Sequence, residues 1–220
     1  MHGDIEALTL TTADGLALEA ELTRPAPGGA VRAAVVLAHP HPQQGGSMRS
    51  LVTSELFAAL PGRGLAVLRF NFRGVGASDG HYGEGVAERA DIVAAVDTIA
   101  DLVVDALPAG DDPVPLVLAG WSFGADVALT VDDARLAGWF LVAPPLRVRP
   151  LDEMVAARDR RPKRFVVPER DQFRRPDAAR ELTADWVATT VVDVPGADHF
   201  LVGRTGIAVD HLDAFVDDLD

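Results

Sequence analysis

Gly120-Trp121-Ser122-Phe123-Gly124 directly follows the apolar run 114–119 and leads into an alanine-rich helical pattern over residues 124–131. The pentapeptide has the form G-x-S-x-G, and a strand before it with a helix after it is the setting in which that motif forms a sharp turn. A serine at the tip of such a turn has a strained backbone, and only very small residues two positions away avoid a collision across the turn. The stretch therefore predicts a strand-turn-helix unit with Ser122 at its tip.

Further apolar runs on both sides of this unit are typical of strands that are buried on both faces. They cover residues 33–38, 65–70, 138–143, 164–167 and 190–194. Helical patterns, in which apolar residues recur three or four positions apart, occupy residues 50–60, 86–102, 124–131, 177–186 and 206–219. Strands that alternate with helices favour a three-layer α/β sandwich, with helices on both faces of a mostly parallel sheet.

The chain opens on a different pattern, in which apolar and polar residues alternate over residues 7–12 and 16–23. An Asp14-Gly15 pair lies between these segments and suits a tight turn, so we expect an antiparallel N-terminal hairpin. No repeat or long linker divides the sequence, and residues 1–220 are expected to form a single domain. Residues 144–163 leave room for a short helix but not for a folded cap domain, so a site beneath them should be open.

Composition excludes several classes of protein. Hydrophobic residues make up 48% of the chain, which is enough for a sizeable core, and the formal net charge of −13 would repel nucleic acid and anionic membranes. There is no cysteine, so disulfides and thiolate chemistry are excluded. The N-terminus is acidic where a secretory signal would be basic, and no apolar run approaches the roughly 20 residues of a membrane span. We expect a cytoplasmic protein, and the oligomeric state stays open.

Ser122 is the candidate nucleophile. Its place at the start of a helix puts unpaired amides beside it, which favours the negative charge that develops during acyl transfer. The amide of Phe123 is therefore the first predicted oxyanion donor. A serine hydroxyl is a poor nucleophile until a base removes its proton, so a histidine is required.

His199 is the candidate base among the six histidines. It lies in a loop directly after the last predicted strand, and the carboxyl ends of parallel strands are where such sheets place their ligands. His2 is terminal and His211 falls in the middle of a predicted helix. The alternative for His199 is a loop histidine that makes a local hydrogen bond.

Asp171 is the candidate acid that orients the histidine. It follows the preceding strand and completes the chain order Ser, Asp, His expected for this kind of site. Glu169 and Asp198 are its rivals. Asp198 adjoins His199, and neighbouring side chains tend to diverge, which makes it the weaker candidate.

The loop after residues 33–38 should supply the second oxyanion donor. Neither Pro40 nor Pro42 has an N–H group, so the amide of His41 is the natural donor, and both prolines stiffen the loop. His39 and His41 could instead be metal ligands, but no third ligand follows at a suitable spacing. We interpret His39 as a hydrogen-bonded structural residue and expect no metal and no other cofactor.

With these residues in place, the sequence resembles small, lidless α/β-hydrolases related to dienelactone hydrolases and bacterial acyl esterases, over nearly the whole chain. The stretches that carry the resemblance are His39-Pro40-His41-Pro42, Gly45-Gly46-Ser47-Met48, Arg69-Phe70-Asn71-Phe72-Arg73-Gly74-Val75-Gly76-Ala77-Ser78, Gly120-Trp121-Ser122-Phe123-Gly124 and Pro195-Gly196-Ala197-Asp198-His199-Phe200. The resemblance implies an eight-stranded, mostly parallel sheet with a Ser-His-Asp site. Dienelactone hydrolases use a cysteine nucleophile, so their specific activity is not implied.

The predicted function is hydrolysis of an ester or a related acyl bond in a small molecule through an acyl-enzyme on Ser122. An acyltransferase or a serine peptidase would use the same residues, and the sequence does not separate these reactions. A third hypothesis is a ligand-binding protein that keeps the fold without catalysis. Trp121, Phe123, Tyr82, Met48 and Leu146 are candidates for lining the pocket or for the core.

Overall fold

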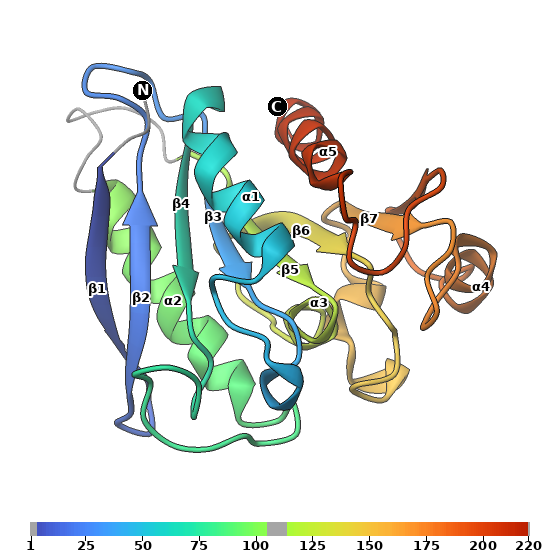
Figure 1. Ribbon diagram of the computed structural model, residues 1–220, viewed down its shortest axis with the longest axis horizontal. Helices are drawn as coiled ribbons and strands as arrows, with labels where there is room; N and C mark the ends of the chain where they lie inside the picture. Colours follow the sequence, from blue (N-terminus) through green and yellow to red (C-terminus); the bar gives the residue numbers. More distant parts are fainter. Residues whose placement is uncertain (1–3, 105–113, 220) are drawn as a thin grey trace.

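The computed structural model describes residues 4–104 and 114–219, and it forms one sheet with the strand order β1-β2-β4-β3-β5-β6-β7-β8 (Figure 1). The strands from β3 onward run parallel to their neighbours, whereas β1 and β2 pair antiparallel with each other and β2 pairs antiparallel with β4. Their bounds are Ile5–Thr11 (β1), Ala17–Thr23 (β2), Ala33–Ala38 (β3), Leu65–Phe70 (β4), Leu116–Trp121 (β5), Leu136–Val142 (β6), Lys163–Pro168 (β7) and Thr189–Val194 (β8). The predicted eight-stranded, mostly parallel sheet with an N-terminal hairpin is confirmed.

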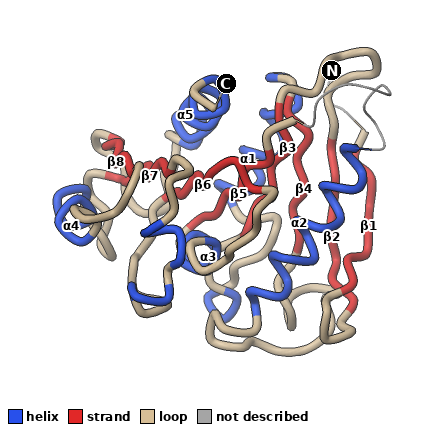
Figure 2. The backbone as a smooth tube through the Cα atoms, turned by 180° about the vertical axis from the view of Figure 1, so that it is seen from behind, coloured by secondary structure: helices blue, strands red, loops and turns tan. Residues whose placement is uncertain are grey.

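Helices cover both faces of this sheet, which confirms the predicted three layers (Figures 1 and 2). On one face lie α1 (Leu51–Ala59) and α5 (Thr205–Asp217), which contact each other and share one buried cluster. On the other face lie α2 (Glu88–Val104), α3 (Phe123–Ala128) and α4 (Pro176–Leu182), whose apolar residues join a second cluster. Short 3₁₀ turns complete the described elements: η1 (Pro42–Gln44), η2 (Leu60–Arg63), η3 (Leu151–Glu153) and η4 (Val155–Arg158).

The N-terminal hairpin forms because its alternating pattern puts apolar side chains on one face. Leu10 pairs with Leu18, and both are fully buried against the cluster that contains α2. Gly15 adopts a φ of 83°, a left-handed conformation that the tight turn requires and that glycine tolerates. The hairpin therefore extends the sheet beyond β4 and buries its own apolar face.

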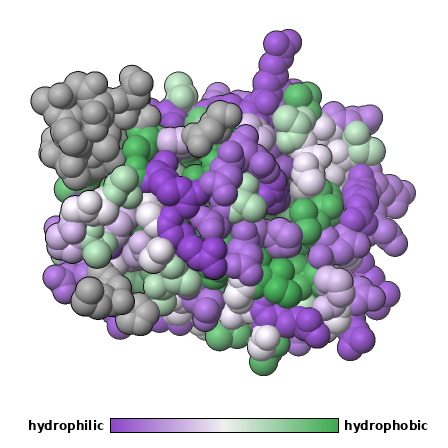
Figure 3. All heavy atoms as spheres, turned by 90° about the horizontal axis from the view of Figure 1, so that it is seen from above, coloured by the Kyte–Doolittle hydropathy of each residue, from purple (hydrophilic) through white to green (hydrophobic). Residues whose placement is uncertain are grey.

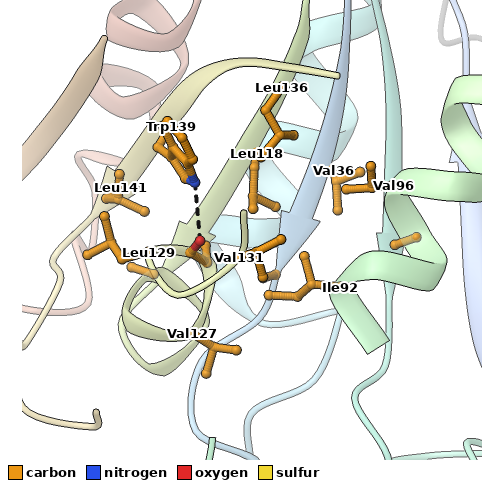
Figure 4. Packing of buried hydrophobic residues seen from close by; sticks show 14 of the residues in the cluster. Val36, Ile92, Val96, Leu118, Val127, Leu129, Val131, Leu136, Trp139 and Leu141 are labelled. Atoms are coloured by element: carbon orange, nitrogen blue, oxygen red, sulfur yellow. Dashed lines mark hydrogen bonds between the residues drawn. The ribbon is translucent and has the colours of Figure 1, made fainter. Parts of the chain in front are cut away.

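Helix α3, which begins directly after Ser122, is anchored by the core around Trp139. This tryptophan on β6 is fully buried, and its indole N–H donates a 3.1 Å hydrogen bond to the carbonyl of Ala128 at the end of α3, drawn as the dashed line in Figure 4. Leu129 and Leu141 pack in the same cluster. A buried indole N–H needs such a partner, and here it also fixes the helix against the sheet.

The segment between β6 and β7, described over its whole length, contains only the turns η3 and η4. No cap domain covers the carboxyl ends of the parallel strands in this segment, as the sequence predicts. Figure 3 looks onto the opposite edge, where the parallel strands begin, and hydrophilic residues cover much of that face. None of the helices in residues 4–104 and 114–219 combines the length and the apolarity that a bilayer crossing requires.

Candidate active site

Ser122 occupies the sharp bend between β5 and α3, with the strained backbone angles φ 56° and ψ −116°. The two glycines of the motif make this bend possible. A Cβ on Gly120 would lie 2.6 Å from the amide nitrogen of Ala125, and a Cβ on Gly124 would lie 2.4 Å from the carbonyl oxygen of Ala38. The helix thus packs backbone to backbone on the end of β3, which brings Ser122 beside the loop that follows β3.

Gly124→Ala is expected to lower the free energy of unfolding by about 3 kcal/mol, because the new methyl group would collide with backbone atoms that cannot move aside. Urea denaturation measures this change. The matched control is Gly206→Ala in α5, where a Cβ would lie more than 4 Å from every described neighbour. That substitution should stabilise the protein by up to about 1 kcal/mol, since alanine favours a helix over glycine. Equal effects of the two substitutions would contradict the close approach at Gly124.

Ser122, His199 and Asp171 form one hydrogen-bonded line. The Nε2 atom of His199 lies 2.9 Å from the Ser122 hydroxyl oxygen, and its Nδ1 atom lies 2.7 Å from Asp171 Oδ2. His199 and Asp171 are both buried, so water does not compete for their contact. The three side chains come from the loops that follow β5, β7 and β8, and the parallel sheet brings them to the same edge.

The carboxylate of Asp171 is held in one orientation by backbone donors. Its Oδ1 atom accepts hydrogen bonds from the amides of Phe173, at 2.7 Å, and Arg174, at 3.1 Å. Its second oxygen is left for His199. The ring of Phe173 packs edge-on against the imidazole with the centroids 4.5 Å apart, which fixes the plane of His199 as well.

The rival groups contact other partners. Glu169 accepts a hydrogen bond from the amide of Gly196, and Asp198 accepts one from the amide of Phe200. His211 is half-buried in the middle of α5, as its position in the sequence predicts. His2 lies outside the described residues. The geometry thus brings together the three residues chosen from the sequence, and their catalytic roles stay a prediction.

The amides of His41 and Phe123 are both free to donate. Within the part of the chain that the structure describes, neither N–H group donates to a protein acceptor. The His41 loop is tightly wound, because its carbonyl accepts bonds from the amides of Gln44 and Gly46, both at 3.0 Å. Free amides on a rigid loop and at the start of α3 are the arrangement that an oxyanion requires.

His39 has a structural position, as predicted. Its Nδ1 atom lies 2.6 Å from the carbonyl oxygen of Pro40, and its Nε2 atom accepts a 3.0 Å hydrogen bond from the amide of Phe72. Burial lowers the pKa of the imidazole to about 4, so the ring is neutral and its proton sits on Nδ1. Both ring nitrogens are occupied, and His39 therefore braces the His41 loop against the loop after β4.

Two cavities open beside Ser122. The first has a volume of about 280 Å³ and includes His199 in its lining. Its lining residues are Pro40, His41, Gln44, Gly45, Gly46, Ser50, Leu51, Trp121, Ser122, Phe173, His199 and Phe200. The second, of about 390 Å³, is lined by His41, Gln44, Ser122, Phe123, Pro145, Arg147, Val148 and Phe173. Among the pocket candidates from the sequence, Trp121 and Phe123 line a cavity, whereas Met48 and Leu146 are buried in the protein and Tyr82 contacts the His41 ring.

The sequence did not predict that Phe173 and Arg147 line the cavities beside Ser122. Phe173 lies two positions after Asp171, and Arg147 lies five positions after the end of β6. The rule that ligand-binding residues follow strand ends would have identified both loops. It would not have identified these side chains within them.

Comparison with known proteins places the chain among serine hydrolases. The family model described as "Serine aminopeptidase, S33" (Hydrolase_4) matches residues 29–167, which is more than half of the chain. The uncharacterized protein RP471 of Rickettsia prowazekii (strain Madrid E) is 34% identical over 110 residues. That match covers 49% of this chain and 43% of RP471, so the aligned region spans less than half of that relative.

Two solved structures are similar over almost their whole length. An alpha-beta serine hydrolase homologue from Coxiella burnetii has a TM-score of 0.77 and 30% sequence identity, and the match covers 94% of this chain and 97% of that one. XC6422 from Xanthomonas campestris, described as an a/b serine hydrolase without lid, has a TM-score of 0.77 and 28% identity, with 98% and 93% covered. The open carboxyl edge seen here agrees with that description.

Proposed function

Because the chain belongs to the α/β serine hydrolase family described as serine aminopeptidase, S33, we propose that it hydrolyses carboxylic esters through an acyl-enzyme on Ser122. The observation that carries the proposal is the continuous hydrogen-bonded line from the Ser122 hydroxyl through His199 to the buried Asp171 carboxylate. His41 and Phe123 line a cavity together with Ser122, and their amides donate to no protein acceptor among the described residues. Together they supply a nucleophile, a base, an orienting acid and an oxyanion site.

In the proposed reaction the Ser122 oxygen attacks the ester carbonyl carbon while His199 Nε2 accepts the hydroxyl proton. The amides of His41 and Phe123 stabilise the negative charge on the carbonyl oxygen, and Asp171 stabilises the imidazolium. The carbon–oxygen bond to the alcohol then breaks, and His199 gives its proton to the departing oxygen. Water repeats the sequence on the acyl-enzyme, which releases the acid and restores the Ser122 hydroxyl.

The charge around Ser122 favours an ester over the amino-terminal peptide that the family description suggests. An aminopeptidase substrate carries a positively charged amine close to the scissile bond, and a carboxylate is the group that pairs with it. In the part of the chain that the structure describes, no aspartate or glutamate lines either cavity beside Ser122, and the second cavity has Arg147. A cationic amine would be repelled there, whereas a neutral or anionic acyl group would not.

Labelling with a fluorophosphonate probe tests the proposal. We expect the wild-type protein to gain one phosphonyl adduct, mapped to Ser122 by mass spectrometry, because the probe reacts with activated serines. Ser122→Ala should gain none. A parallel assay compares p-nitrophenyl acetate with aminoacyl p-nitroanilides, and only the ester should be cleaved. An unlabelled wild-type protein, or an adduct on another residue, would overturn the proposal.

A further inference from the structure

The two cavities beside Ser122 would hold different parts of the substrate in the proposed reaction. His199 must deliver its proton to the departing alcohol oxygen, so the alcohol lies on the side of the imidazole. The cavity on that side is lined by His199, Leu51, Trp121 and Phe200, and none of the described residues that line it is an arginine, lysine, aspartate or glutamate. The acyl chain must therefore extend into the second cavity, which is lined by Phe123 and Arg147 and not by His199.

Arg147 brings an uncompensated positive charge to this acyl cavity. Within residues 4–104 and 114–219 its guanidinium forms no ion pair, whereas Arg149, two positions further on, pairs with Glu153. The Arg147 guanidinium instead lies 4.8 Å from the centroid of the Phe173 ring, the ring that also packs against His199. Stacking on Phe173 restrains the guanidinium and leaves its N–H donors available.

The backbone that carries Arg147 is fixed to the helix that begins after Ser122. Asp126, a fully buried residue of α3, accepts hydrogen bonds from the amides of Leu146, Arg147 and Val148 at 2.9, 2.8 and 2.9 Å. Leu146 adopts a φ of 52°, a strained conformation for leucine that these bonds help to hold. The Asp126 carboxylate accepts its hydrogen bonds from these three backbone amides and not from the Arg147 side chain. The Arg147 guanidinium can therefore bind a ligand.

We propose that Arg147 binds a carboxylate at the far end of the acyl chain, so that the substrate is a half-ester of a dicarboxylic acid with an uncharged alcohol. This inference rests on the proposed function. A planar guanidinium matches a carboxylate through two parallel hydrogen bonds. The chain as a whole carries a net charge of −13, which repels anions, so an anionic acyl group needs a local cation of this kind.

Hydrolysis of matched ester pairs tests this subsite. The first pair is monomethyl glutarate and methyl glutaramate, in which an amide of similar size replaces the carboxylate; the second is monomethyl adipate and methyl adipamate. We expect the wild-type protein to prefer the half-ester of at least one pair about 10-fold in kcat/KM, as a hydrogen-bonded charge pair would provide. Arg147→Met should abolish this preference, so that the two members of each pair are cleaved with equal kcat/KM.

The matched control is Arg160→Met, which removes the same charge. Arg160 is exposed and precedes β7, so it lies at the edge where the strands begin, away from Ser122. This variant should keep the preference. Equal kcat/KM values for both members of each wild-type pair, or a preference that survives Arg147→Met, would overturn the subsite.

A binding measurement separates failure of the subsite from failure of the proposed function. Calorimetric titration with glutarate and adipate should show binding to the wild-type protein and to Arg160→Met, and none to Arg147→Met. If no ester is hydrolysed, not even p-nitrophenyl acetate, the proposed function is wrong, and so is the proposal of a half-ester substrate. If p-nitrophenyl acetate is cleaved but neither dicarboxylate binds, only the subsite is overturned.

Discussion

Ser122→Ala is expected to lower kcat/KM for p-nitrophenyl acetate by about 10⁴-fold or more, because the acyl-enzyme can no longer form. What remains would come from water that His199 activates and from the two oxyanion amides. The fold should be unaffected, since the Ser122 side chain makes no hydrogen bond among the described residues other than the one to His199. Initial-rate kinetics together with thermal unfolding of the variant check both statements.

Ser50→Ala is the matched control for this prediction. Ser50 also lines the first cavity, but its hydroxyl accepts a hydrogen bond from the amide of Ser47 and does not contact His199. Its removal should change kcat/KM by no more than about threefold, an effect of less than 1 kcal/mol. A Ser122→Ala protein that matched the rate of the control would exclude Ser122 as the nucleophile.

The fold could be predicted from the sequence because each buried parallel strand is a short apolar run with turn residues at its ends. The runs at 33–38 and 65–70 coincide with β3 and β4. The run at 114–119 misses the end of β5, which continues to Trp121 because that residue still pairs with Val142 of β6. The chain therefore turns from β5 into α3 at the single residue Ser122, which has a positive φ. The apolar pattern alone does not show this.

Helix α3 is shorter than its sequence pattern suggests. Apolar residues continue to Val131, but the helix ends at Ala128. The hydroxyl of Thr130 donates a hydrogen bond to the carbonyl of Val127, and the amides of Thr130 and Val131 bond three residues back, as in a tighter turn. Local side-chain bonds of this kind compete with a helix and are not visible in hydrophobic periodicity.

The residues of the hydrogen-bonded line could be chosen from the sequence because each follows a strand end and because they occur in the chain order Ser, Asp, His. The role of Arg147 could not be predicted in this way, because the position of its side chain depends on the path of the loop after β6. That path includes the left-handed residues Ala143 and Leu146, neither of which is a glycine, and it is held by the buried Asp126. Nothing in the local sequence signals those conformations, since they are imposed by contacts between distant segments.

Asp171→Asn is expected to lower kcat/KM by about 10³-fold or more while the protein stays folded. In the wild-type chain Asp171 Oδ1 accepts the amides of Phe173 and Arg174. An asparagine would keep its carbonyl oxygen toward these donors and would turn its NH₂ group toward His199 Nδ1. That nitrogen would then act as an acceptor, so the proton would sit on Nε2, where it blocks transfer from Ser122. The loss should therefore appear in kcat/KM and in the rate of fluorophosphonate labelling alike.

Comparing Asp171→Asn with the corresponding substitutions of Glu169 and Asp198 tests which carboxylate orients His199. Glu169→Gln and Asp198→Asn also replace a carboxylate by an amide near His199 in the sequence, yet their side chains bond to the amides of Gly196 and Phe200. Each of these variants should keep kcat/KM within about threefold of the wild-type value, because neither carboxylate contacts the imidazole. If Asp198→Asn or Glu169→Gln lost activity while Asp171→Asn kept it, the orienting acid would be wrongly assigned, since only the group bonded to Nδ1 controls the tautomer of His199.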